Sequence, residues 1–117
     1  MPSVLLVGYD PDAIPGVDGT TIRAMIDQQM NEFARLGIEA NLVHVVADGS
    51  AEPTLVAALG QRPWDVVLIG GGIRKSDNLV ELLEMVVNLA HRHAAQAAIA
   101  FNTNPGDSVQ AVQRQLR

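Results

Sequence analysis

The sequence alternates four times between a short, mostly apolar run and a longer amphipathic segment. The short runs span residues 3–8, 39–46, 66–69 and 97–101. Runs of this length, bounded by turn residues, are typical of β-strands. The longer segments carry apolar residues three and four positions apart, as in Ile22, Met25 and Ile26, which is typical of a helix with one buried face. Strand and helix repeated in this order predict an α/β fold with a parallel sheet.

Polar residues and glycines at the ends of the amphipathic segments set the expected helix boundaries. Asp18 is a typical N-cap for the first helix, and Gly37 is a typical residue just after its end. The other helices are expected at about 50–60, from 76 or 77 to 93, and after Asp107. The segment 70–76 between a strand and a helix is expected to be a loop.

The apolar runs also predict how the strands are ordered. Runs 3–8 and 66–69 are almost unbroken, which is typical of strands covered on both faces. The strand order 2-1-3-4 gives that cover, whereas the order 1-2-3-4 leaves one face of these strands bare. We therefore expect a three-layer, flavodoxin-like open sheet that is one strand shorter than usual. The connections are short, so residues 1–117 are expected to form a single α/β domain.

Composition excludes several classes of function. The chain has no cysteine, which excludes a disulfide scaffold, a cysteine zinc site and a thiol nucleophile. Thirteen acidic residues against eight Lys and Arg give a net charge of −5, so no nucleic-acid partner is expected. No apolar run is long enough for a signal peptide or a membrane span, so no membrane partner and a cytoplasmic location are expected. No cofactor or metal motif is recognised, and His91 and His93 are spaced wrongly for a helical metal pair.

In an open parallel sheet, ligands bind beyond the carboxyl ends of the strands, near the point where the strand order reverses. Loops 8–19, 47–50, 70–76 and 102–107 are expected to meet there. The candidate ligand-binding residues in these loops are Tyr9, Asp10, Gly71, Gly72, Arg74, Lys75, Asn102 and Asn104.

The loop 70–76 is the most suggestive of the four. Its three glycines allow a ligand to approach the backbone closely, and a helix start offers N–H groups. Arg74 and Lys75 add positive charge, so the loop could hold a phosphate or a carboxylate. The alternative is that the glycines permit a tight turn while both bases are solvated.

The other candidate side chains also have two interpretations. Asp10, with Asp12 nearby, is either a general base or a Mg²⁺ ligand near the end of the first strand, or a turn residue that bonds a nearby N–H group. Asn102 and Asn104 either contact a polar ligand or close the Asn-Pro-Gly turn. Tyr9 is either a lid over the site or a packed loop residue. His44, within the second strand, is expected to be a structural or surface histidine.

The segment 66–107 carries the motifs Gly-Gly-Gly-Ile-Arg at 70–74 and Ala-Phe-Asn-Thr-Asn-Pro at 100–105. With these motifs it resembles a group of small uncharacterised bacterial α/β proteins of flavodoxin-like fold. The resemblance implies the fold and assigns no catalytic residue.

Three functions are consistent with these patterns. The first is binding of a small phosphorylated or carboxylated metabolite at the ends of strands 1, 3 and 4. The second is a small enzyme with Asp10 as base and Arg74 as anion holder. The third is an oligomeric interaction protein. Val80, Met85 and Val87 widen the apolar face of the third helix and strand 97–101 lacks charge or proline, so a homodimer is predicted.

Overall fold

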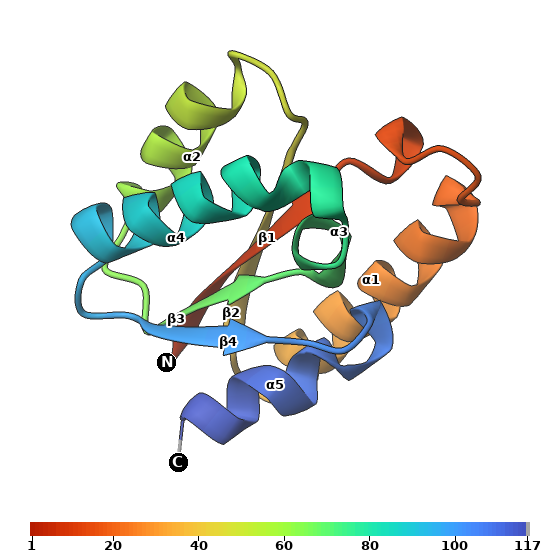
Figure 1. The fold of residues 1–117 in the computed structure, drawn as a ribbon. Coiled ribbons are helices and arrows are strands. Elements are labelled where there is room, and N and C mark those ends of the chain that lie inside the picture. The colour runs from red at the N-terminus through yellow and green to blue at the C-terminus, as the bar shows by residue number, and fades with distance from the viewer. Residues whose placement is uncertain (117) are drawn as a thin grey trace.

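The computed structural model, which describes residues 1–116, contains a parallel sheet with the strand order β2-β1-β3-β4 (Figure 1). The strands are β1 (Ser3–Tyr9), β2 (Glu39–Val45), β3 (Val66–Ile69) and β4 (Ala98–Phe101). In the central part of the sheet, Leu6 of β1 pairs with Leu42 on one side and Leu68 on the other. The predicted strand order is confirmed, and this order is that of a flavodoxin-like sheet without its fifth strand.

Five helices accompany the sheet in the described part of the chain. They are α1 (Gly19–Arg35), α2 (Ala51–Leu59), α3 (Gly71–Arg74), α4 (Val80–His93) and α5 (Ser108–Gln115), with 3₁₀ turns at Pro11–Ala13, Asp77–Leu79 and Pro105–Asp107. Helices α2 and α4 cover one face of the sheet, and α1 and α5 cover the other (Figure 1). The fold is therefore three-layered. The predicted N-cap is confirmed, since the Asp18 carboxylate accepts a hydrogen bond from Thr20 N at 3.0 Å.

The segment 70–76 differs from its expected form. It was expected to be a loop, but Gly71–Arg74 forms the short helix α3, and α4 begins only at Val80 after a 3₁₀ turn. A Gly-Gly pair disfavours helix in isolation. Here Asn102, from the loop after β4, accepts a hydrogen bond from Gly71 N. A contact between distant parts of the chain thus stabilises a helix start that local sequence does not favour.

Each face of the sheet has its own apolar core. On the α2–α4 face, the fully buried Trp64 packs with Leu55, Val67 and Val86, and its indole N–H donates to Ala58 O at 3.0 Å. On the α1–α5 face, the core is formed mainly by residues of β1, β3, β4, α1 and α5. They include Val4, Leu6, Phe33, Leu68, Val109 and Val112. Burial of these side chains supplies the main favourable term in folding.

The outer side of α4 exposes fewer apolar side chains than its sequence pattern predicts. Val80 is 53% exposed, whereas Met85 and Val87 pack against the α2–α4 core. The wide apolar face that predicts a homodimer therefore shrinks mainly to Val80. Self-association through α4 or the β4 edge stays a prediction.

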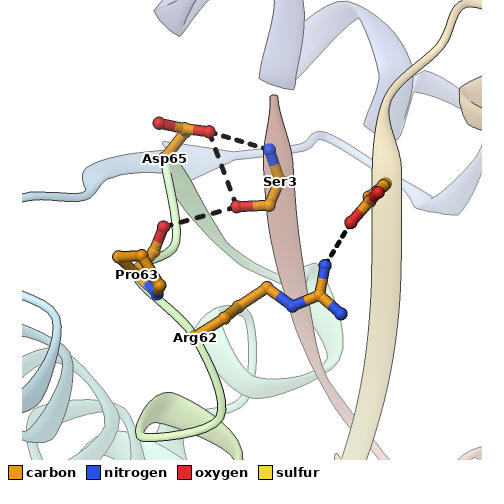
Figure 2. A network of polar contacts seen from close by, with 5 residues as sticks. Ser3, Arg62, Pro63 and Asp65 are labelled. Atoms are coloured by element: carbon orange, nitrogen blue, oxygen red, sulfur yellow. Dashed lines mark hydrogen bonds and ion pairs between the residues drawn. The ribbon is translucent and has the colours of Figure 1, made fainter. Parts of the chain in front are cut away.

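The amino ends of β1 and β3 are joined by polar contacts (Figure 2). Ser3 N donates to Asp65 Oδ2 at 2.8 Å, and Asp65 N donates back to Ser3 O at 2.9 Å. Arg62 lies over the Trp64 ring and pairs with Glu39 of β2. These contacts hold three strands together at the end opposite the predicted site.

Candidate functional site

A cavity of about 390 Å³ opens at the carboxyl end of the sheet, on the α1–α5 face. Apolar side chains form its floor and its wall toward α1: Leu6, Leu42 and Leu68 from the strands, Ile14 and Val17 from the loop after β1, and Ile22 and Ile26 from α1. The remaining lining comes mostly from the segments that follow β3 and β4. The cavity thus lies where an open parallel sheet is expected to bind ligands.

The cavity exists because α1 is not packed evenly along its length. Phe33, near the end of the helix, is fully buried, and it is the one buried residue of α1. Ile22 and Ile26, on the same apolar stripe nearer the start, are only partly buried. The helix therefore contacts the sheet closely at one end and leaves the space above the strand ends unfilled at the other.

His44 of β2 forms part of the lining beside Gly8 of β1. A Cβ on Gly8 would lie 3.2 Å from His44 Cδ2, so the imidazole occupies the space that a side chain there would need. Burial lowers the pKa of His44 below its ordinary value of 6.5. The imidazole is therefore neutral at pH 7 and has one donor and one acceptor nitrogen.

Asn102 is buried and links the segments that follow β3 and β4. Its Oδ1 accepts hydrogen bonds from Gly71 N at 3.2 Å and from Arg74 Nη2 at 3.1 Å, and its Nδ2 donates to Ser108 Oγ at 3.1 Å. Both ends of the amide therefore have partners within the chain. Asn102 positions the cavity wall, and the Gly71 N–H that was expected to face a ligand is bonded to it.

Arg74 contacts the protein itself rather than the cavity. Its Nε donates to Ile69 O at 2.9 Å, its Nη2 donates to Asn102 O, and its guanidinium lies 5.2 Å from the centre of the Phe101 ring. Partial burial lowers the pKa of Arg74, although a guanidinium remains charged. These contacts join the ends of β3 and β4, and Arg74 is not among the residues that line the cavity.

Lys75, the next residue, is exposed and lies at the cavity. Its stem passes over Gly71, where a Cβ would be 3.3 Å from Lys75 Cε, and its Nζ donates to Thr103 O. An ammonium group carries three N–H donors. The described contact uses one of them, which leaves donors for a ligand.

The remaining predicted residues have structural contacts. Asp10 Oδ1 accepts from Asp12 N at 3.0 Å as the N-cap of the turn Pro11–Ala13. Asn104 caps the turn Pro105–Asp107, with its Oδ1 2.7 Å from Gly106 N. Tyr9 ends β1, and its hydroxyl accepts from Ala47 N at 3.3 Å.

The structure brings most of the predicted site residues together. Those that line the cavity are Tyr9, Gly71, Gly72, Lys75, Asn102 and Asn104, and those that do not are Asp10 and Arg74. Sequence reasoning missed Ile22, Ile26 and Leu42, because apolar residues on a helix or strand face are normally core. It also did not place His44 at the site. The signal that could have indicated His44 is its pairing with Gly8 on the neighbouring strand β1, because a glycine leaves room for the imidazole.

The described residues contain no group of three or more His, Asp or Glu side chains placed to hold a metal ion. Within residues 1–116, no helix has the length and apolar character needed to cross a membrane. Among the residues of 1–116 that line the cavity, Lys75 has the one formally charged side chain.

Comparison with known proteins adds a likeness in fold. No known protein family matches the chain, and no curated protein matches it in sequence. Among solved structures, the chain is similar to a fragment from Peptoclostridium difficile 630 that carries the name "putative lipoprotein". The two are 10% identical, superpose with a TM-score of 0.61, and are each covered over 100% of their length. At this identity the likeness shows the α/β fold alone.

Proposed function

We propose that this protein binds a small metabolite in the cavity at the carboxyl ends of β1 and β3 and beside the loop after β4. The observation that carries this proposal is the cavity of about 390 Å³ with partly buried Ile22 and Ile26 in its wall. Small-molecule sites occupy roughly 300–1,000 Å³ and are mostly apolar with a few polar groups. The metabolite has an apolar body and one anionic group, either a phosphate or a carboxylate, next to Lys75.

Binding without catalysis is favoured over the small enzyme that the sequence also suggests. A general base must come within hydrogen-bond reach of the proton that it takes. The Asp10 carboxylate caps a turn and is outside the cavity lining, and Arg74 is bonded to Ile69 and Asn102. The two residues assigned to an enzyme therefore lack access to a ligand in this cavity.

A cavity-filling variant tests the proposal. The thermal stability of the protein is measured with a panel of small apolar acids and phosphates. A ligand at about 100 times its Kd raises the free energy of unfolding by about 2.7 kcal/mol. We expect Ile26→Phe, which fills the cavity, to abolish this stabilisation.

Val80→Phe is the matched control, because Val80 is 53% exposed on α4 and outside the cavity. This variant should retain the stabilisation. If every compound stabilises Ile26→Phe and Val80→Phe to the same extent as the unmodified protein, ligand binding in this cavity is rejected.

A further inference from the structure

The distribution of polar groups around the cavity gives it two chemically different ends. The sheet order places β2 and β3 on opposite sides of β1. Leu42 lies toward the β2 side, with Ile22 and Ile26 of α1 in the wall. Lys75, Ser76 and the loop after β4 lie toward the β3 side. A bound molecule would therefore have an apolar part over the sheet and a polar part beside Lys75.

The charge of the lining restricts the charge of the ligand. Although the chain has thirteen acidic residues, none of them lines the cavity in the described structure. With His44 neutral, Lys75 supplies a single positive charge. A ligand with one negative charge is neutralised by this arrangement, whereas a second negative charge has no partner in the cavity.

The hydrogen-bond donors point to the same class of ligand. Asn102 has partners at both ends of its amide, Asn104 caps a turn, and Ser76 Oγ is bonded to Asn78. Lys75 Nζ is the strongest donor left, since Arg74 contacts backbone carbonyls. A phosphomonoester carries about −1.5 to −2 charges and three acceptor oxygens, and it is usually held by several donors.

From these observations, and resting on the proposed function, we infer that the ligand is a monocarboxylate with an apolar chain or ring. Its carboxylate binds Lys75 Nζ, and its apolar part lies against Ile22, Ile26 and Leu42. The volume is near the lower end of the range for small-molecule sites, so the acid is small. A phosphate ester of the same chain fits the volume but not the charge.

Calorimetric titration of the unmodified protein with straight-chain acids from butyrate to decanoate tests the inference. The matched alcohol and the alkyl phosphate of the best chain length are the comparison probes. We expect the acid to bind about three- to fivefold more tightly than the alcohol, as for a partly exposed ion pair. The preference should decrease as salt is added, because salt screens exposed charges.

The variant Lys75→Gln should remove the preference. The affinity for the acid should fall to that for the alcohol, while the affinity for the alcohol stays unchanged. Arg92→Gln removes one positive charge on α4, outside the cavity lining, and should leave both affinities unchanged. Equal affinity for acid and alcohol, or a preference that persists in Lys75→Gln, overturns the carboxylate inference and leaves the proposed function intact. Tighter binding of the alkyl phosphate also overturns it. Absence of binding by all probes rejects the proposed function itself.

Discussion

The helices pack against the two faces of the sheet to different extents. On the α2–α4 face, the fully buried residues include Trp64 before the amino end of β3, Val67 within β3 and Ile73 beyond its carboxyl end. On the α1–α5 face, Phe33 is fully buried near the amino ends of the strands, but Ile22 and Ile26 near the carboxyl ends are not. The α2–α4 face has a continuous buried core, whereas the α1–α5 face combines a core with the cavity at the carboxyl end of the sheet. An amphipathic stripe therefore identifies the face that a helix turns inward but not how closely the helix approaches the sheet.

The position of the start of α1 accounts for the difference. The segment before it contains a 3₁₀ turn, and Asp12 of this turn pairs with Arg23 of α1. Further along the helix, Met25 contacts the turn after β4, since its Cε lies 3.4 Å from the place where a Cβ on Gly106 would be. Part of the inner side of α1 is thus occupied by a turn instead of by the sheet. The space above Leu6 and Leu68 stays open.

Truncating matched aliphatic side chains on the two faces should give the largest difference. Leu55→Ala on α2 removes a fully buried side chain and should reduce the free energy of unfolding by about 3 kcal/mol, within the range of 2–5 for such changes. Ile26→Ala on α1 removes a partly buried side chain from the cavity wall and should cost only about 1 kcal/mol, since little apolar area leaves contact with protein. Urea unfolding of both variants measures this. Equal losses would show that the α1 face is packed as tightly as the other.

The neighbouring bases Arg74 and Lys75 should differ in the same way. Arg74→Ala leaves Ile69 O and Asn102 Oδ1 without a charged donor, and should cost about 1.5–3 kcal/mol of stability. Lys75→Ala removes an exposed side chain and should change stability by about 0.5 kcal/mol or less. The measurement is the midpoint of denaturant unfolding of each variant, compared where the dependence of the free energy of unfolding on denaturant concentration is unchanged. A stable Arg74→Ala protein would return Arg74 to the set of residues available to a ligand.

Much of the fold follows from sequence because it depends on local patterns. The strand order followed from the unbroken apolar runs of β1 and β3, and the start of α1 followed from Asp18, which caps it. The helix α3 could not be predicted, because its first N–H is satisfied by Asn102, 31 residues away along the chain. A contact of this kind leaves no periodic trace in the sequence.

The location of the cavity could be predicted from the sequence, but the chemistry of its lining could not. The rule for open parallel sheets indicated the loops around Gly71 and Asn104, and both residues line the cavity. It could not separate Arg74 from Lys75, because two adjacent bases look alike in sequence while one contacts carbonyls and the other lies at the cavity. Nor could it distinguish Ile22 and Ile26 from ordinary core residues, since only the spacing between α1 and the sheet decides this.

The pH dependence of stability should show the smallest effect, and it depends on the same cavity. Burial lowers the pKa of His44, the Asp10 and Asp12 carboxylates oppose this shift, and Arg23 adds to it. The unfolded chain therefore binds a proton at His44 at a higher pH than the folded protein does. Stability from this group is fully present above about pH 6.5 and is lost as the pH falls through 6.5 toward the folded pKa. His44→Gln should flatten this part of the profile between pH 7.5 and 5, measured by urea unfolding in the same buffers.

The shift of His44 also reports on occupancy of the cavity. A neutral apolar probe such as octanol displaces water from the lining that His44 shares with Leu42, and removal of water disfavours the imidazolium. An NMR titration of the His44 ring should therefore give a pKa below 6.5 that falls further when the probe is bound. In Ile26→Phe, where the added ring takes the place of the probe, the pKa should already be lower and the probe should have no effect. A His44 pKa at its ordinary value in both proteins would mean that the imidazole faces bulk water, and that the cavity is shallower than its lining residues indicate.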